Sequence, residues 1–190
     1  MKSKKHVMLL LGTALAIMQT SACAPHSVTS GSAKVSAPAP TAPPHRAPGV
    51  AAHLVTFDDL DFNVFTNQKW SELHKSHRHD IVVHWPDGHS TTGIDKHISD
   101  LAAMFVWAPD TRIKEHPIAF GEGEWTAVTG VMEGTFSKPM PLPEGKSIPP
   151  TGKAYKIQMV TIGHWKDGIM DEEYLFWDNH EFMKQIGLAQ

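Results

Sequence analysis

The stretch that decides the fold spans residues 154–178 and reads AYKIQMVTIGHWKDGIMDEEYLFWD. Apolar and polar residues alternate through much of both halves, which is the period-two pattern of half-buried strands. Between the halves, Lys166-Asp167-Gly168 has the composition of a tight hairpin turn. We therefore predict two long antiparallel strands, at residues 154–165 and 169–177, that lie side by side.

The segments on either side of this hairpin complete the predicted fold. Two more alternating runs precede it, and before those runs apolar residues recur at three- and four-residue steps. The expected helices are 56–65, 70–75, 94–106 and 181–188, and the other expected strands are 79–85, 112–120 and 125–136. Helices followed by a meander of long strands predict an α+β domain, with helices covering one face of a curved antiparallel sheet.

Residues 1–22 have the organisation of an export signal. Three lysines stand near the start, and residues 7–18 form an apolar run that is too short to span a bilayer. The small residues that follow allow two interpretations: Ala22-Cys23-Ala24 fits a simple cleavage site, and Ser21-Ala22-Cys23 resembles a lipobox in which Cys23 becomes lipidated. We expect an exported protein of the periplasm or cell envelope, attached to the membrane through a lipid on Cys23.

The segment 23–50 is rich in Pro, Ala and Ser and has no periodic apolar positions. Such a composition does not bury enough apolar surface to fold, so we predict a disordered tether. Residues 51–190 then form one domain of ordinary size. Because Cys23 is the only cysteine in the chain, we expect no internal disulfide.

The net charge argues against one class of function, and the histidine content raises the question of a metal site. The net charge is −3 and the basic residues are scattered, which argues against a nucleic-acid partner. The chain has thirteen histidines, and five of them fall within sixteen residues: His74, His77, His79, His84 and His89. Imidazole is a common metal ligand, but the spacing contains no metal motif, and His79 and His84 should face opposite ways on a strand. We therefore expect surface histidines and no metal site.

Several short motifs together resemble those of SnoaL-like polyketide cyclases, which belong to the nuclear transport factor two-like superfamily. The run from Pro149 to Lys153 before a long strand, then Asp167-Gly168, Glu172 and Asp178, is similar to the C-terminal half of that family. Further matches are Trp85-Pro86-Asp87-Gly88, Ala108-Pro109-Asp110, Gly123-Glu124 and Gly134-Thr135. The resemblance covers about residues 54–188.

This resemblance implies a cone-shaped curved antiparallel sheet packed with three N-terminal helices, an α+β barrel whose open end admits a small hydrophobic molecule. Family members of known chemistry close a ring in an aromatic polyketide by aldol condensation, without metal or cofactor. Many relatives in the superfamily dimerise through the outer face of the sheet, so we expect a homodimer.

The resemblance also places an acid/base aspartate in the final strand, at Asp178, with a histidine one strand earlier, at His164. On an ideal strand, Met170, Glu172, Tyr174 and Phe176 share a face with Asp178. That face would form an apolar wall ending in a carboxylate, and burial would raise the pKa of this carboxylate toward neutrality. The alternative is that Asp178 begins the last helix as a capping box with Glu181.

The expected substrate contacts come from three elements. His84 and Trp85 end the first strand, Met104 lies on the third helix, and Glu172, Tyr174 and Phe176 lie on the last strand. Aromatic side chains there would stack on a flat ligand. Core packing is the alternative for Trp85 and Met104, and a surface charge is the alternative for Glu172.

Two classes of function follow from these expectations. The first is a cofactor-free cyclase or isomerase that acts on a hydrophobic, polyketide-like carbonyl compound, with Asp178 and His164 as its acid–base pair. The second is a non-enzymatic envelope protein, which either binds a small ligand in the same cone or serves as an interaction domain that dimerises through the outer face of its sheet. Export favours the second class, because polyketides are normally cyclised in the cytoplasm beside their synthase.

Overall fold

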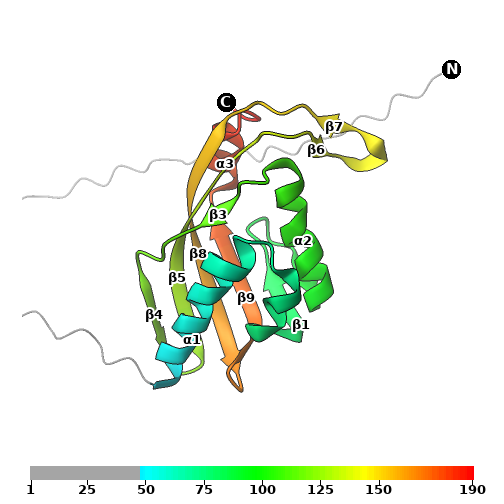
Figure 1. Ribbon diagram of the computed structural model, residues 1–190. Coiled ribbons are helices and arrows are strands. Elements are labelled where there is room, and N and C mark those ends of the chain that lie inside the picture. Colours follow the sequence, from blue (N-terminus) through cyan, green and yellow to red (C-terminus); the bar gives the residue numbers. More distant parts are fainter. Residues whose placement is uncertain (1–47) are drawn as a thin grey trace, which may run out of the picture. The chain divides into compact units, whose positions relative to one another are not determined.

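The helices of the computed structural model gather on one side of its sheet (Figure 1). The structure describes residues 48–190, so the predicted signal peptide, Cys23 and most of the predicted tether lie outside the described part. The helical segments are α1 (Pro48–Asp59), the π-helix η1 (Leu60–Phe65), the 3₁₀ helices η2 (Trp70–Lys75) and η3 (Pro143–Gly145), α2 (Ile94–Trp107) and α3 (Asn179–Gln185). Among residues 48–190, no helix combines the length and apolar character that a membrane span requires.

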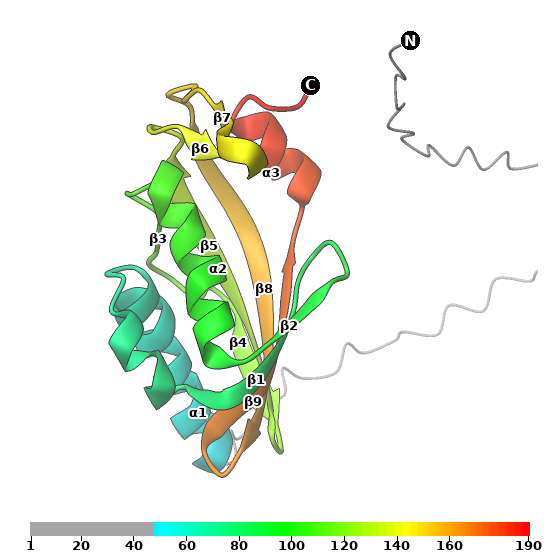
Figure 2. The same ribbon diagram turned by 90° about the vertical axis from the view of Figure 1, so that its right-hand side faces the viewer.

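The main sheet has the strand order β2-β1-β9-β8-β5-β3, and β4 also pairs with β5. Its strands are β1 (His77–His84), β2 (Ser90–Thr92), β3 (Arg112–Ile113), β4 (Ala119–Glu122), β5 (Trp125–Thr135), β8 (Ala154–Lys166) and β9 (Ile169–Trp177). The sheet curves around α2 and does not close on itself, so the cone is an open one (Figure 2). The α+β prediction is confirmed, and so is the hairpin of β8 and β9.

One pairing departs from the expected antiparallel sheet. Strand β9 is antiparallel to β8 but parallel to β1, which places the last strand of the chain between the first strand and the rest of the sheet. A small separate hairpin, β6 (Met140–Pro141) with β7 (Ser147–Ile148), occupies the Pro-rich segment between β5 and β8. The start of β1 therefore lies beside the start of β9.

The core lies between the concave face of the sheet and the helices. Alternate residues of β8 point inward, and the largest of them, Trp165, is 1 % exposed. Its indole stacks on His53 of α1 at 4.6 Å and donates a 2.8 Å hydrogen bond from Nε1 to Thr126 Oγ1 on β5. Burying an aromatic side chain of this kind contributes about 1.5–3 kcal/mol, and the bond satisfies its only polar atom.

Two boundaries differ from the sequence prediction. Helix α1 begins at Pro48 instead of Thr56, inside the segment predicted as tether, and Val50 is fully buried. The run 112–120 is not one strand but two short ones, β3 and β4. Pro117 lies between them, and proline has no N–H to donate to a neighbouring strand.

A bulge in β9 decides which side chains face the core. Opposite β8, His164 pairs with Glu172 while Trp165 pairs with Met170, so Asp171 is an extra residue on β9. Met170 is buried, and after the bulge Glu173 is the next inward residue. Inserting one residue reverses the alternation of a strand. The prediction that Met170 shares a face with Glu172, Tyr174 and Phe176 is therefore wrong.

Candidate functional site

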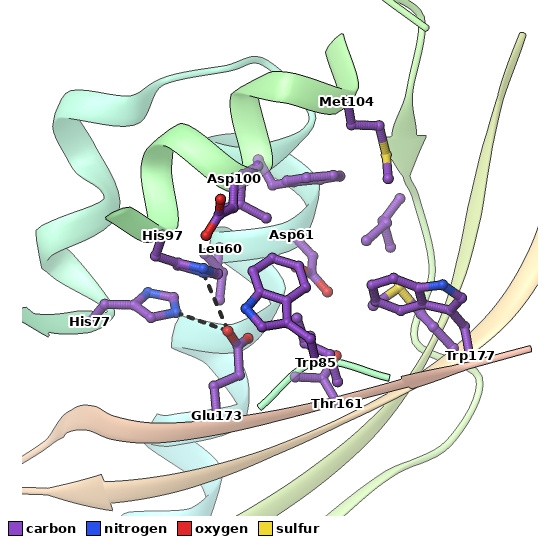
Figure 3. A pocket seen from close by; sticks show the side chains of 15 residues that line it. Leu60, Asp61, His77, Trp85, His97, Asp100, Met104, Thr161, Glu173 and Trp177 are labelled. Atoms are coloured by element: carbon purple, nitrogen blue, oxygen red, sulfur yellow. Dashed lines mark ion pairs between the residues drawn. The ribbon is translucent and has the colours of Figure 1, made fainter. Parts of the chain in front are cut away.

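A cavity lies between the sheet and the helices η1 and α2 (Figure 3). Its volume is about 70 Å³, several times the roughly 10–15 Å³ that one water molecule needs. Most of the lining is apolar: Leu60, Phe65, Trp85, Leu101, Met104, Ile113, Met159, Leu175 and Trp177. Five ionisable side chains also reach it, namely Asp61, His77, His97, Asp100 and Glu173. An apolar cavity with a few converging polar groups is the usual form of a small-molecule site.

Glu173 meets two imidazoles inside this cavity. Its Oε2 lies 3.3 Å from His97 Nε2 and 3.7 Å from His77 Nε2, and Figure 3 shows both rings turned toward it. The three side chains are 6 %, 3 % and 0 % exposed, respectively. They come from β9, α2 and β1, and the parallel pairing of β1 with β9 brings the strand residues together.

Ser76 lies beside the second nitrogen of the His77 ring. When the hydroxyl of Ser76 donates to the Leu73 carbonyl at 3.1 Å, Ser76 Oγ accepts the 2.8 Å hydrogen bond from His77 Nδ1. In the neutral ring, the lone pair of Nε2 then faces Glu173. Among the described residues, His77 Nε2, His97 Nδ1, Glu173 Oε2 and Asp100 Oδ2 are buried polar atoms without a hydrogen-bond partner.

Burial and mutual charge set the protonation of this group. Burial lowers the pKa of His97 to about 4, although the Glu173 carboxylate opposes the change. Burial alone would raise the pKa of Glu173, but the neighbouring His77 and His97 rings outweigh it, so this pKa lies below its ordinary value. At neutral pH the site therefore holds a carboxylate beside a neutral His97.

A second acid–imidazole chain reaches the cavity from the opposite wall. His116 Nε2 lies 2.8 Å from Asp61 Oδ2, and His116 Nδ1 lies 2.7 Å from Asp58 Oδ1. Both partners are carboxylates, so both ring nitrogens donate only when the imidazole is protonated. The His116 side chain is 3 % exposed, whereas that of Asp58 is 52 % exposed. These hydrogen bonds therefore connect the solvent at Asp58 to the cavity wall at Asp61.

Among the hydrogen-bonded side chains of Asp58, His116 and Asp61, the pKa values of Asp61 and His116 shift in the directions that acid–base chemistry needs. Burial raises the pKa of Asp61, although the hydrogen bond from His116 opposes the rise. Burial lowers the pKa of His116, but Asp61 and Asp58 outweigh it and the net change is upward. Asp61 also sits in the π-helix η1, and such local widenings of a helix are frequent at functional sites.

A known family profile covers most of the described domain. Residues 56–186 match the family profile described as SnoaL-like polyketide cyclase. This chain belongs to the SnoaL-like polyketide cyclase family. The resemblance predicted from the sequence motifs is therefore confirmed. No curated protein matches the chain.

Solved structures share the SnoaL-like fold at low sequence identity. A protein from Jannaschia sp. CCS1, assigned as a SnoaL-like polyketide cyclase, is 19 % identical with a TM-score of 0.66, covering 77 % of this chain and 99 % of that one. IdmH from Streptomyces antibioticus, assigned as a polyketide cyclase, is 20 % identical with a TM-score of 0.60, covering 71 % and 98 %. A Xanthomonas campestris protein with the same assignment is 13 % identical with a TM-score of 0.64, covering 73 % and 99 %.

In this SnoaL-like protein, the predicted pair of His164 and Asp178 does not come together. His164 pairs with Glu172, whereas Asp178 follows Trp177, which pairs with Met159 further along β8. Asp178 is exposed, and its Oδ1 accepts a 2.9 Å hydrogen bond from the backbone N–H of Glu181. The expectation that the pair is adjacent is wrong, because the register separates the two residues. Asp178 caps α3, as the alternative interpretation predicts.

The predicted substrate contacts divide between the two faces of the SnoaL-like sheet. Trp85 and Met104 line the cavity as expected. On the other face, Glu172 Oε1 accepts a 2.8 Å hydrogen bond from the Tyr174 hydroxyl and lies 2.8 Å from His84 Nε2. Phe176 is 49 % exposed. The bulge at Asp171 places Glu172, Tyr174 and Phe176 outside, and parallel pairing sets His84 beside Tyr174.

Four of the residues that matter most here are not among those predicted from the sequence: Asp61, His97, His116 and Glu173. Two of them carried a signal, because each interrupts an otherwise apolar stripe. Asp61 falls between Leu60 and Val64, and His97 lies three residues after Ile94 on the buried face of α2. A polar residue at a core position of a helix needs a partner, which makes it a candidate for function.

Proposed function

We propose that this protein is an acid–base enzyme of the polyketide-cyclase type, acting inside the cavity on a small apolar carbonyl compound. The observation that carries the proposal is Asp61, a carboxyl at the wall of an apolar cavity that is hydrogen-bonded to the buried His116. Burial raises the pKa of Asp61 toward the range in which a carboxyl group both accepts and returns a proton.

The proposed step is an intramolecular aldol cyclisation. The Asp61 carboxylate removes a proton from a carbon next to a carbonyl group, which leaves an enolate. The enolate carbon forms a bond to a second carbonyl carbon of the same molecule, and the oxygen of that carbonyl becomes an alkoxide. The protonated Asp61 returns its proton to the alkoxide while the first carbonyl re-forms, so the product is an isomer of the substrate.

His116 is assigned a positioning role in this scheme. Its two hydrogen bonds, to Asp61 and Asp58, hold the base in one orientation and link it to the exposed Asp58 carboxylate. A base that is fixed in the reacting geometry removes an entropic part of the barrier. The chain also offers a path along which a proton exchanges with solvent.

The walls of the cavity favour a flat, apolar substrate. Trp85 and Trp177 both line the cavity, and their rings meet edge to face with centroids 6.5 Å apart. Aromatic faces and the Met104 side chain suit an aromatic ring with few polar groups. Family membership supports a polyketide-like compound, because the solved relatives are assigned as polyketide cyclases.

Proton exchange at carbon tests this proposal without the natural substrate. The protein is incubated with α-tetralone in D₂O, and loss of the proton signal next to the carbonyl is followed by NMR. We expect the wild type to accelerate exchange and Asp61→Asn to lose about 10²–10⁴-fold of that acceleration. The matched control is Asp59→Asn on the exposed side of the same helical segment, which should exchange like the wild type.

Two results would contradict the assignment. Equal exchange by the wild type and Asp61→Asn would remove Asp61 from the chemistry. Saturable binding of α-tetralone with no exchange by the wild type would favour the non-enzymatic ligand-binding alternative. Circular dichroism and thermal unfolding of each variant separate loss of chemistry from loss of fold.

We further infer export and lipid attachment at Cys23, supported by the basic, apolar and small-residue order of residues 2–24. The test is the mass of the mature N-terminal peptide from protein made in a bacterial host with its native leader. A diacylated Cys23 at the new N-terminus is expected, and Cys23→Ala should release the protein from membranes. An unmodified N-terminus after Ala24 would support simple cleavage.

We also infer a homodimer that uses the outer face of the sheet. Phe120, Trp125 and Phe176 are 59 %, 43 % and 49 % exposed, which is unusual for large apolar side chains on a monomer surface. Light scattering coupled to size exclusion should give twice the chain mass, and Phe176→Glu should give the single chain mass. A wild-type monomer at high concentration would overturn this inference.

A further inference from the structure

We propose that His77, His97 and Glu173 bind a divalent transition-metal ion, with Zn²⁺ as the expected occupant. One donor atom from each residue lies within 4.8 Å of the others, and all three residues are buried. The carboxylate oxygen is 3.3 Å from a nitrogen of His97 and 3.7 Å from one of His77. Sequence spacing gave no hint of this set, because the ligands come from three elements that are far apart in the chain.

The unpartnered atoms of this group point to a cation. His77 Nε2 lies 3.7 Å from Glu173 Oε2, and in the tautomer in which His77 Nδ1 donates to Ser76 Oγ a lone pair at Nε2 faces that oxygen. In that tautomer the two atoms are both acceptors in a buried space, and they repel unless a cation lies between them. Neither atom has a hydrogen-bond partner among residues 48–190. A metal ion would satisfy both together with a nitrogen of His97.

Outside this group, the histidine–carboxylate pairs of residues 48–190 make hydrogen bonds or lie at the surface. His84 with Glu172, and His164 with Asp171, make ordinary hydrogen bonds of 2.8 and 2.6 Å. His116 uses both ring nitrogens on carboxylates. In the described part of the chain, only the group around Glu173 combines two imidazoles and a carboxylate as a candidate metal site.

The geometry is close to what Zn²⁺ requires. Bonds of about 2.0–2.2 Å to nitrogen and oxygen place tetrahedral ligand atoms roughly 3.3 Å apart, and the observed separations are 3.3 and 3.7 Å. Two imidazoles among three ligands favour a transition metal over Mg²⁺ or Ca²⁺, which prefer oxygen. Ser76 Oγ fixes the orientation of the His77 ring, as an outer-shell partner of a metal ligand does.

The position of the group gives the ion an open side. All three residues line the cavity, together with apolar walls that include Trp85 and Leu175. Three protein ligands with a free fourth position is the arrangement of catalytic zinc sites. The ligand expected there is an oxygen of the bound carbonyl compound, which the ion would polarise. This last role rests on the proposed function, whereas metal binding itself does not.

The test measures Zn²⁺ binding by the full chain, prepared without an affinity tag and stripped with EDTA. Equilibrium dialysis and calorimetry compare the wild type with Glu173→Gln and His97→Gln, which keep side-chain size. The matched controls are Glu172→Gln and His84→Gln, a carboxylate and an imidazole on the outer face of the same sheet. The N-terminal histidines and Cys23 are the same in every variant, so any Zn²⁺ they bind cancels when a variant is compared with the wild type.

We expect one Zn²⁺ per chain that the two cavity variants lose and the two controls keep. Ser76→Ala should weaken binding about 10–100-fold, as removal of an outer-shell partner does. Co²⁺ should give the intense visible absorption of a four-coordinate site in the wild type and not in His97→Gln. Zn²⁺ should also raise the Tm of the wild type and of the controls, and leave that of the cavity variants unchanged.

Three outcomes would overturn the proposal: no Zn²⁺ bound by the wild type, equal binding by the wild type and both cavity variants, or loss in the controls alone. If Glu173→Gln does not fold, His97→Gln and Ser76→Ala still decide the matter. Asp61→Asn separates this proposal from the proposed function. That variant should bind Zn²⁺ normally and fail in proton exchange, so each idea can fail without the other.

Discussion

His116 Nε2 and Asp61 Oδ2 are joined by a 2.8 Å hydrogen bond, although 55 residues separate them in the chain. The bond links the π-helix to the segment between β3 and β4. That segment leaves the sheet after Ile113 and rejoins it at Ala119, which lets the His116 ring reach the helices. The irregular stretch that breaks the predicted strand is therefore the one that places the proposed base in position.

The first prediction concerns the pH dependence that His116 gives to stability. Its pKa is higher in the folded protein than in the unfolded chain, where it is about 6.5. The stabilisation is therefore complete below pH 6.5 and is lost as the pH rises through the folded value. His116→Gln should lower the free energy of unfolding by about 2 kcal/mol at pH 6.

Urea unfolding between pH 6 and pH 9 checks this. The difference between the wild type and His116→Gln should shrink steadily as the pH rises. His89→Gln, at a half-exposed surface histidine, serves as the control and should show a small difference with no such trend. A constant gap for His116→Gln across the range would mean that the ring is not charged in the folded state.

The second prediction concerns His97 and has the opposite sign. Burial lowers its pKa to about 4 in the folded protein, against about 6.5 in the unfolded chain. The unfolded chain then binds more protons between these values, so stability present above pH 6.5 is lost as the pH falls toward 4. The loss is about 3 kcal/mol, from roughly 1.4 kcal/mol for each pKa unit.

Metal-free protein in EDTA is the right sample for this measurement. His97→Gln should flatten the part of the curve between pH 4 and pH 6.5. The slope of the curve, and not the stability at pH 7, reports the missing titration. An unchanged slope in the variant would assign the acid sensitivity to other groups.

The third prediction separates Asp178 from catalysis. Its carboxylate accepts the Glu181 N–H at the start of α3. Asp178→Ala should therefore cost about 1 kcal/mol of stability, the usual effect of removing an N-cap. Proton exchange on α-tetralone should stay within about twofold of the wild type, in contrast with Asp61→Asn. A loss of exchange without a loss of stability would restore Asp178 as the acid–base residue.

The fourth prediction concerns Trp165 and Thr126 in the core. Thr126→Val removes the acceptor of the 2.8 Å hydrogen bond from Trp165 Nε1 and leaves that N–H buried without a partner. The expected cost is about 1–3 kcal/mol in the free energy of unfolding. Thr92→Val, on exposed β2, is the control and should change stability by less than about 0.5 kcal/mol. Similar losses for both variants would show that the hydrogen bond contributes little.

The sequence predicted the elements whose periodicity is long and regular. The alternation along β5 and β8 and the three- and four-residue steps of α2 each extend over ten residues or more. A pattern of that length leaves few alternative structures. Asp167-Gly168 also marked the hairpin correctly, because both residues adopt positive φ there, 54° and 81°.

The site could not be predicted in the same way, because it depends on one inserted residue and on a non-local pairing. Nothing in the letters MDEEYLF marks Asp171 as a bulge, yet that residue decides whether Glu172 or Glu173 faces the cavity. The parallel pairing of β1 with β9 is equally invisible, since the strands are about ninety residues apart in the sequence. Side chains do alternate along the strand, but the tertiary structure decides which of them face the core.

The insertion of β9 between β1 and β8 has a consequence for biosynthesis. Until the ribosome has delivered β9, β1 with β2 and β8 with β5 are two separate ribbons with unpaired edges. Glu173 arrives only on that final strand, so a chain cut short before it holds its histidines without their carboxylate. Such fragments expose hydrogen-bonding edges that invite aggregation, and termination before β9 should yield insoluble protein instead of a soluble protein with an incomplete site.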